Sequence, residues 1–143
     1  MKSKITSYFP PLAFFLFILW MVWSADTNHK NFIMDIGHSV PFGDKIGHFL
    51  LFGILALLMN TALKFRKTNL KYRTFHLGSL LVFAFAAIEE CSQLAFQSRT
   101  FDLVDVLFDL LGIGLLSSIS FRRYLVYQLR RWVDYLSMSL QVD

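Results

Sequence analysis

Four long apolar segments, each bounded by charged or turn-forming residues, constrain this chain more than any other feature of its sequence. They run from Tyr8 to Trp23, from Ile46 to Leu63, from about Phe75 to Phe96 and from Leu103 to Phe121. Segments of this kind approach the roughly 20 residues that a helix needs to cross the hydrocarbon core of a bilayer. The sequence therefore predicts an all-α protein, a membrane bundle of four transmembrane helices.

The composition agrees with a membrane protein and counts against a disordered chain or a soluble domain. Apolar residues make up 55% of the chain and charged residues only 17%, which excludes a disordered chain and disfavours a soluble domain, where about a quarter is charged. The net charge of +4 does not indicate nucleic-acid binding, because the Lys and Arg residues lie between the apolar segments. The lone Cys91 allows neither an intrachain disulfide nor a cysteine-based zinc site.

The distribution of basic residues predicts the orientation. Eleven Lys and Arg residues lie on the side of the two termini and three on the other side. The eleven are Lys2, Lys4, Lys64, Arg66, Lys67, Lys71, Arg73, Arg122, Arg123, Arg130 and Arg131; the three are Lys30, Lys45 and Arg99. Because cytoplasmic loops carry the excess of Lys and Arg, we expect a multi-pass membrane protein with both termini in the cytoplasm. Trp23 does not suit a signal-peptidase site, so the first helix is expected to stay uncleaved.

The last part of the chain has an amphipathic pattern. Leu125, Leu129, Trp132 and Leu136 recur at helical spacing, with arginines on the other side. We therefore divide the chain into a transmembrane domain, residues 1–121, and a cytoplasmic amphipathic basic tail, residues 122–143. The tail is expected to be an interfacial helix on anionic lipid, with docking onto a partner helix as the alternative.

Ionisable and other polar residues gather toward the outer ends of three of the predicted helices. They are Asp44, Lys45 and His48 on the second helix, Glu89, Glu90 and Gln93 on the third, and Arg99, Asp102, Asp105 and Asp109 at the fourth. Spacings of three and four residues place Asp44 with His48 on one helix face, Glu90 with Gln93 on another, and the three aspartates of the fourth helix in one polar stripe. Six carboxylates face only two fixed cations, Lys45 and Arg99. The excess predicts protonated acids, a bound cation or a water-filled pocket open to the outside.

A structural role competes with a functional one for some of these residues. Asp44, Asp102 and Glu89 suit interfacial helix caps as well as they suit a site. Glu90, Gln93, Asp105 and Asp109 lie well inside the apolar segments, where ionisable residues usually mark a functional site. The sequence contains no H-E-x-x-H zinc motif, no G-x-S-x-G nucleophile elbow and no phosphate-binding glycine loop.

Three short motifs of this cluster resemble a known family. They are Asp44-Lys45-x-x-His48-Phe49, Glu90-x-x-Gln93, and Arg99-x-Phe101-Asp102-x-x-Asp105 followed by Asp109-x-x-Gly112. In order and spacing they are similar to the VanZ-like family of small bacterial membrane proteins, which commonly has Asn where this chain has Asp109. The resemblance implies a polytopic helical membrane protein and, for the member that gave the family its name, a contribution to teicoplanin resistance. It implies no reaction.

The leading functional hypothesis is an outward-facing pocket that binds or modifies the head group of a lipid or of a lipid-linked envelope precursor. Lys45 and Arg99 would hold an anionic group and Gln93 would orient it, with Asp44, Asp102 and Asp109 completing the binding site. Glu90, Asp105 and His48 are the candidates for proton transfer. A divalent cation such as Mg²⁺, Mn²⁺ or Zn²⁺ suits these ligand types, but no spacing demands a metal site.

Two other functions stay open, and the oligomeric state is not predicted. A proton- or ion-coupled transporter would also use buried acids. A non-catalytic envelope protein would use them only to pack the bundle. Whether the protein is an enzyme is likewise left open.

Overall fold

The computed structural model of the protein describes residues 4–27, 29, 32–96 and 100–139. Helices dominate the described chain, as predicted. In order, the elements are η1 (Lys4–Ser7), α1 (Phe9–Asp26), α2 (Phe32–Ser39), α3 (Gly43–Ala62), β1 (Lys67–Leu70), β2 (Arg73–His76), α4 (Leu77–Ser92), η2 (Gln93–Ala95) and α5 (Leu103–Ser139).

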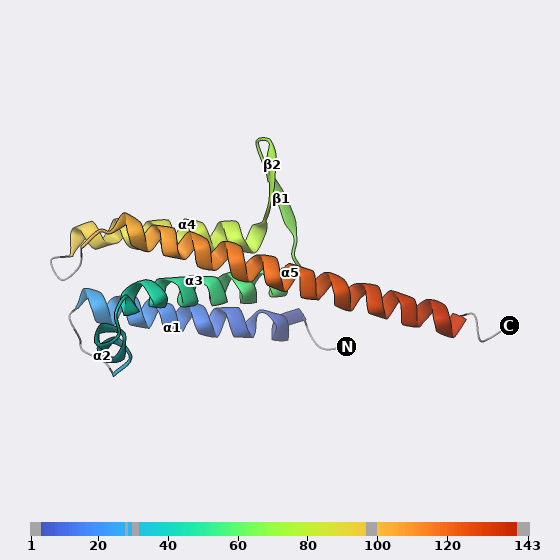
Figure 1. Cartoon of the computed structure of the whole chain (residues 1–143), viewed down its shortest axis with the longest axis horizontal. Coiled ribbons are helices and arrows are strands. Elements are labelled where there is room, and N and C mark those ends of the chain that lie inside the picture. The colour runs from blue at the N-terminus through green and yellow to red at the C-terminus, as the bar shows by residue number, and fades with distance from the viewer. Residues whose placement is uncertain (1–3, 28, 30–31, 97–99, 140–143) are drawn as a thin grey trace.

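Four of the described helices are long and apolar enough to cross a membrane: α1, α3, α4 with η2, and α5 as far as Val133. In Figure 1, α1 and α4 run in one direction and α3 and α5 in the other. The start of α1, the β-hairpin and the end of α5 therefore lie toward one end of the bundle. The end of α1, α2 and the start of α5 lie at the opposite end. The predicted four-helix membrane bundle is confirmed, with both termini on one side.

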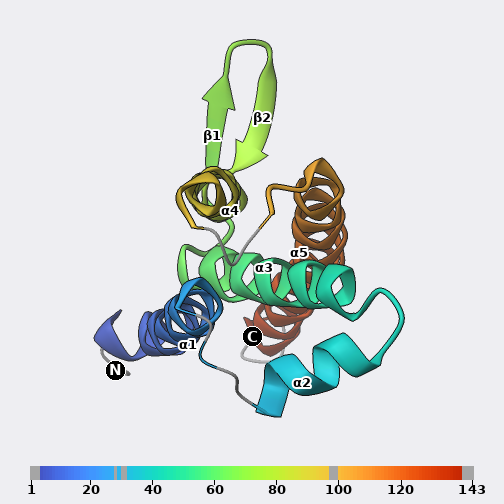
Figure 2. The same ribbon diagram turned by 90° about the vertical axis from the view of Figure 1, so that its left-hand side faces the viewer.

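Helix α3 is the centre of the bundle. It contacts α1, α2, α4 and α5, which surround it in Figure 2. Its buried side chains Phe52, Leu55 and Ala56 form one apolar core with side chains of α1, α4 and α5, namely Ile18, Val82, Ala86 and Ile113. Many Leu, Phe and Trp side chains on the outer faces are exposed, as expected for surfaces that contact lipid tails.

The packing of α3 against α5 depends on two glycines. A Cβ atom on Gly53 would lie 2.6 Å from Leu116 Cδ1 and 2.9 Å from the carbonyl oxygen of Gly112. A Cβ atom on Gly112 would collide with the carbonyl oxygen of Phe49. Small residues at a crossing let two membrane helices approach closely along their backbones. The crossing fixes which faces of α3 and α5 meet, and so which polar residues face one another.

Helix α5 is longer than a membrane span. Its 37 residues extend about 55 Å at roughly 1.5 Å per residue, against about 30 Å for the hydrocarbon core. No Gly or Pro follows Gly114, so no residue favours a break. The tail predicted from residue 122 therefore continues the fourth span directly and projects beyond the bundle in Figure 1, whereas the sequence pattern led us to expect a helix along the membrane surface.

The β-hairpin between α3 and α4 was not predicted. Strands β1 and β2 pair antiparallel, with Lys67 opposite His76 and Leu70 opposite Arg73. At the base of the hairpin, the ring of His76 lies 4.9 Å from that of Phe121 on α5. The sequence indicates only a basic loop here, because the strands are four residues long and lack apolar alternation.

Candidate functional site

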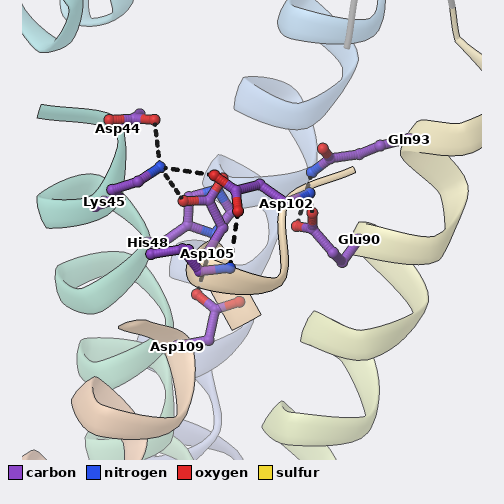
Figure 3. A network of polar contacts seen from close by, with 9 residues as sticks. Asp44, Lys45, His48, Glu90, Gln93, Asp102, Asp105 and Asp109 are labelled. Atoms are coloured by element: carbon purple, nitrogen blue, oxygen red, sulfur yellow. Dashed lines mark hydrogen bonds and ion pairs between the residues drawn. The ribbon is translucent and has the colours of Figure 1, made fainter. Parts of the chain in front are cut away.

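Most of the predicted site residues meet at the end of the bundle opposite the termini, as Figure 3 shows. They are Asp44, Lys45 and His48 on α3, Glu90 on α4, Gln93 at the start of η2, Asp102 just before α5, and Asp105 and Asp109 on α5. Arg99, the remaining predicted site residue, lies outside the described residues. Three helix ends thus bring their polar faces together, while the functional role of each residue stays a prediction.

The ammonium group of Lys45 contacts three aspartates. Lys45 Nζ lies 3.0 Å from Asp44 Oδ2, 3.0 Å from Asp102 Oδ2 and 2.9 Å from Asp105 Oδ1. An ammonium group has three N–H donors, so these contacts engage all of them. Lys45 therefore joins the start of α3 to the start of α5, and it is not free to hold an anionic ligand in the way that the sequence led us to expect.

Asp102 begins α5 and ties it to α4. Its Oδ1 accepts a hydrogen bond from the Val104 backbone N–H at 2.8 Å, the arrangement of a helix N-cap. Its own backbone N–H donates to Glu90 Oε1 at 2.7 Å. The Val104 N–H and the Lys45 ammonium lower the pKa of the Asp102 carboxyl from its ordinary value. Asp102 is thus held as a carboxylate at the mouth of the cluster.

His48 and Asp109 form the deepest polar pair of the cluster. His48 Nδ1 lies 3.1 Å from Asp109 Oδ1, and the Asp109 side chain is fully buried. The other carboxylate oxygen, Asp109 Oδ2, has no hydrogen-bond partner among the described residues. A carboxylate on one ring nitrogen fixes the orientation and tautomer of a histidine. Asp109 therefore sets the direction in which the free side of the His48 ring points.

Gln93 holds two neighbouring glutamates side by side. Its Nε2 donates to Glu89 Oε1 and to Glu90 Oε2, both at 3.1 Å. Glu89, Glu90 and Gln93 are all buried, with exposed fractions of 4%, 1% and 2%. One ring nitrogen of His48 and one carboxylate oxygen from each glutamate lie within 4.8 Å of one another. The end of α4 thus places two buried carboxylates next to the imidazole of α3.

A cavity of about 560 Å³ opens beside this cluster. Its polar lining residues include Asp44, His48, Glu89, Gln93 and Asp105. Its apolar lining comes from α1, α2 and α3, and includes Phe17, Ile18, Met21, Val22, Ile33, Met34, Leu50, Leu51 and Phe52. The cavity therefore has a polar end and long apolar walls.

The cavity differs in detail from the pocket that the sequence predicts. Lys45, Glu90, Asp102 and Asp109 are not among the described residues that line it, and Asp109 contacts His48. Glu89 lines the cavity although it is absent from the predicted site residues. Its spacing of four residues from Gln93 was the signal that could have identified it.

A second polar cluster, not anticipated from the sequence, joins the same helices farther along the bundle. Asn60 Nδ2 donates to Ser79 Oγ at 2.8 Å and to Ser117 Oγ at 3.0 Å, and the Ser79 backbone N–H donates to Asn60 Oδ1 at 3.0 Å. Asn60 is fully buried. A neutral and mutually satisfied network of this kind fastens α3, α4 and α5 together.

Comparison with known proteins agrees with this architecture. No curated protein and no solved structure shows a significant match to the chain. The sequence profile of the VanZ/LLP1 family matches residues 14–124, a range that includes all of α3 and α4, most of α1, the first part of α5 and the whole polar cluster. The chain belongs to the VanZ/LLP1 family.

Proposed function

We propose that this protein acts in the bacterial cytoplasmic membrane by binding the head group of a lipid or of a lipid-linked envelope precursor in the cavity beside α3. The observation that carries the proposal is the division of the cavity into a polar end and apolar walls. An amphipathic ligand would place its head group against His48, Gln93 and Asp105 and its chain along α1 and α2.

The dimensions of the cavity support this assignment. Its volume of about 560 Å³ falls in the range of roughly 300–1,000 Å³ that is typical of small-molecule sites. Such sites are mostly apolar and use a few polar groups to orient the ligand, which is the composition found here. Part of the walls comes from α1 and α3, which are long and apolar enough to cross a membrane, so a lipid chain would need no aqueous route to reach them.

The charges of the polar end define the head group further. Lys45 is held by three aspartates, while Glu89, Asp105 and Asp44 face the cavity. This surface favours a head group that donates hydrogen bonds, as sugar hydroxyls and amides do, or an anionic one that arrives with a cation. We therefore expect the ligand to be a lipid with a large polar head group.

If the protein also modifies the head group, His48 is the best placed of the three candidates for proton transfer. It lines the cavity, and Asp109 orients its ring. Glu90 is engaged by Gln93 and by the Asp102 backbone N–H, and Asp105 is engaged by Lys45. A general base must lie within hydrogen-bond reach of the proton that it removes, and the cavity gives His48 that access.

A transporter is less well supported. Between the His48–Asp109 pair and the Asn60 network, the described core is apolar and includes Phe52, Leu55 and Ile113. A proton or ion relay needs polar groups or water along the whole path. The apolar layer favours a site that opens to one side of the membrane.

The cavity can be tested by filling it. Gly47 lines the cavity, and a Cβ atom there would meet no heavy atom within 4 Å, so Gly47→Leu should project into the cavity without a backbone clash. Gly114 on α5 has equal space around it and lies outside the cavity lining, so Gly114→Leu is the matched control. The measurement is mass spectrometry of the lipids that co-purify with each variant from bacterial membranes.

We expect one lipid class to be enriched over the bulk membrane in the native protein and in Gly114→Leu, and to be lost from Gly47→Leu. Equal lipid retention by the two leucine variants would exclude the cavity as the lipid site. A role in teicoplanin susceptibility, which the family resemblance implies for another member, is part of the same proposal. A deletion strain complemented with Gly47→Leu should then differ in teicoplanin susceptibility from the same strain complemented with Gly114→Leu.

A further inference from the structure

A ring nitrogen of His48 and oxygens of Glu89 and Glu90 form a compact set of metal-type ligands. The three atoms come from α3 and α4 and lie within 4.8 Å of one another. A tetrahedral metal with ligands at about 2.0–2.1 Å holds them about 3.4 Å apart, so the three atoms would move closer together on binding one. Imidazole and carboxylate together suit zinc or manganese better than magnesium or calcium, which prefer oxygen ligands alone.

The contact between His48 and Asp109 is an independent observation that points to the same ligand. With Nδ1 hydrogen-bonded to Asp109, the lone pair of Nε2 is left for a metal. Histidines that bind metals commonly donate their other N–H to a carboxylate in this way. Asp109 is fully buried, and its Oδ2 has no hydrogen-bond partner in the described chain, so little else in the described structure accounts for its placement.

The two glutamates are held in position as metal ligands usually are. Gln93 donates to both of them, and the Asp102 backbone N–H donates to Glu90. Such outer hydrogen bonds orient ligating carboxylates while leaving lone pairs on their oxygens. Glu90 receives these hydrogen bonds from neutral donors, whereas Lys45 is engaged by the aspartates. The buried Glu90 carboxylate therefore lies where a cation would stabilise it.

We propose that His48, Glu89 and Glu90 bind a divalent transition-metal cation of the zinc or manganese class, with Asp109 as the residue that orients His48. His48 and Glu89 line the cavity, which gives the metal an entry path. Three protein ligands leave a coordination position for water or for an oxygen of a ligand in the cavity. The inference goes beyond the proposed lipid site, because a head group can bind in the cavity without a metal.

The test uses the full-length protein, purified in nanodiscs, stripped with a chelator and titrated separately with Zn²⁺ and Mn²⁺. The metal content is measured by mass spectrometry, and Mn²⁺ binding is also followed by electron paramagnetic resonance. His48→Gln and Glu89→Gln remove one ligand each. Asp35→Asn, which neutralises an exposed acid of α2 outside the cluster and outside the cavity lining, is the matched control. Circular dichroism establishes that each variant keeps its helical content.

We expect the native protein and Asp35→Asn to bind one of the two metals alike, and His48→Gln and Glu89→Gln to bind it at least tenfold more weakly. Asp109→Asn should weaken binding by about 10–100-fold, the usual effect of removing a partner of a ligating histidine. Equal metal binding by the native protein and the two ligand variants would overturn the proposal, as would metal binding by none of them.

Lipid retention, measured in the chelated protein, separates the two proposals. Metal binding without an enriched lipid would refute the lipid site and leave the metal site standing. An enriched lipid in a protein that binds no metal would refute the metal site and leave the lipid site standing. Glu90→Gln provides a second ligand variant if His48→Gln fails to fold.

Discussion

Lys45 has more structural consequences than any other single side chain of the cluster. Its ammonium group contacts Asp44 beside it and Asp102 and Asp105 at the start of α5. The Lys45 side chain is 16% exposed and that of Asp105 11%, whereas Asp44 is 54% exposed. Ion pairs contribute more where water is excluded, so the Lys45–Asp105 contact should outweigh the Lys45–Asp44 contact.

We predict that Lys45→Gln lowers the stability of the bundle by about 1–3 kcal/mol, because it leaves carboxylates near one another without their cation. Asp44→Asn should change the stability by about 0–1 kcal/mol, as expected for an exposed pair. The measurement is thermal unfolding in detergent, followed by circular dichroism. Combining Lys45→Gln with Asp105→Asn should restore part of the loss. A double variant that is less stable than the sum of the single changes would contradict the pairing.

Helix α5 combines two parts with different surroundings. Its first part packs on α3, while Leu125, Leu129 and Trp132 in its second part are 47%, 55% and 62% exposed. Arg122, Arg123 and Arg130 line a shallow surface depression on the same stretch. An exposed apolar stripe beside arginines is typical of helices that bind anionic lipid surfaces.

We predict that a peptide of residues 122–140 becomes helical on vesicles with anionic lipid and that added salt weakens its binding. Replacing Arg130 and Arg131 with Gln should weaken the free energy of binding to anionic vesicles by roughly 2 kcal/mol, at about 1 kcal/mol for each arginine near the membrane surface. Circular dichroism and vesicle sedimentation provide the measurements, and purely zwitterionic vesicles provide the control. If neither helicity nor affinity appears on anionic vesicles, the second part of α5 has another purpose.

The elements differ in how far the sequence predicts them. The second apolar segment, predicted from Ile46 to Leu63, matches α3 closely, because turn residues and charges mark both of its ends. The hairpin could not be predicted, since its turn depends on the left-handed backbone of Lys71, with φ 57°, and on aromatic packing at its base. The tail predicted from residue 122 continues the helix of the fourth span, which the sequence did not predict, because amphipathic periodicity reports the faces of a helix and not its direction.

The same limit applies to the site. The asymmetric placement of ionisable residues predicts which helix ends meet, because charges avoid the bilayer centre. It does not predict which side chains of these helix ends contact one another. Lys45 reaches Asp105 and His48 reaches Asp109 because the Gly53–Gly112 crossing sets the rotation of α3 relative to α5. That rotation depends on atomic contacts between segments about 60 residues apart in sequence, which periodicity within one helix cannot report.

At the scale of the whole molecule, the polar cluster lies at one end of the bundle and most of the basic residues of the sequence lie toward the other. The bundle brings both termini and the hairpin to the same end. The basic residues at that end favour its placement in the cytoplasm, so the cavity would open on the outer side.

We predict this orientation for the protein in intact cells. In a Cys91→Ser background, a cysteine at Asp35 on α2 should react with a membrane-impermeant maleimide added outside. A cysteine at Asn69 in the hairpin should react only after the membrane is permeabilised. Because both positions lie in exposed parts of the described structure, the comparison isolates the membrane side. The reverse labelling pattern would place the cavity on the cytoplasmic side.

The long sequence separation of the ion pairs also determines when they can form during synthesis. Lys45 precedes Asp102 by 57 residues and Asp105 by 60. At about 5–20 residues per second, the ribosome needs roughly 3–12 s to supply these partners after it has added Lys45. Until then the long lysine side chain must extend toward the lipid head groups and water. The polar site is therefore the last part of the bundle to be completed. A nascent chain that stops before α5 has the cavity walls of α1, α2 and α3, but it lacks the two acids at the start of α5 that neutralise Lys45.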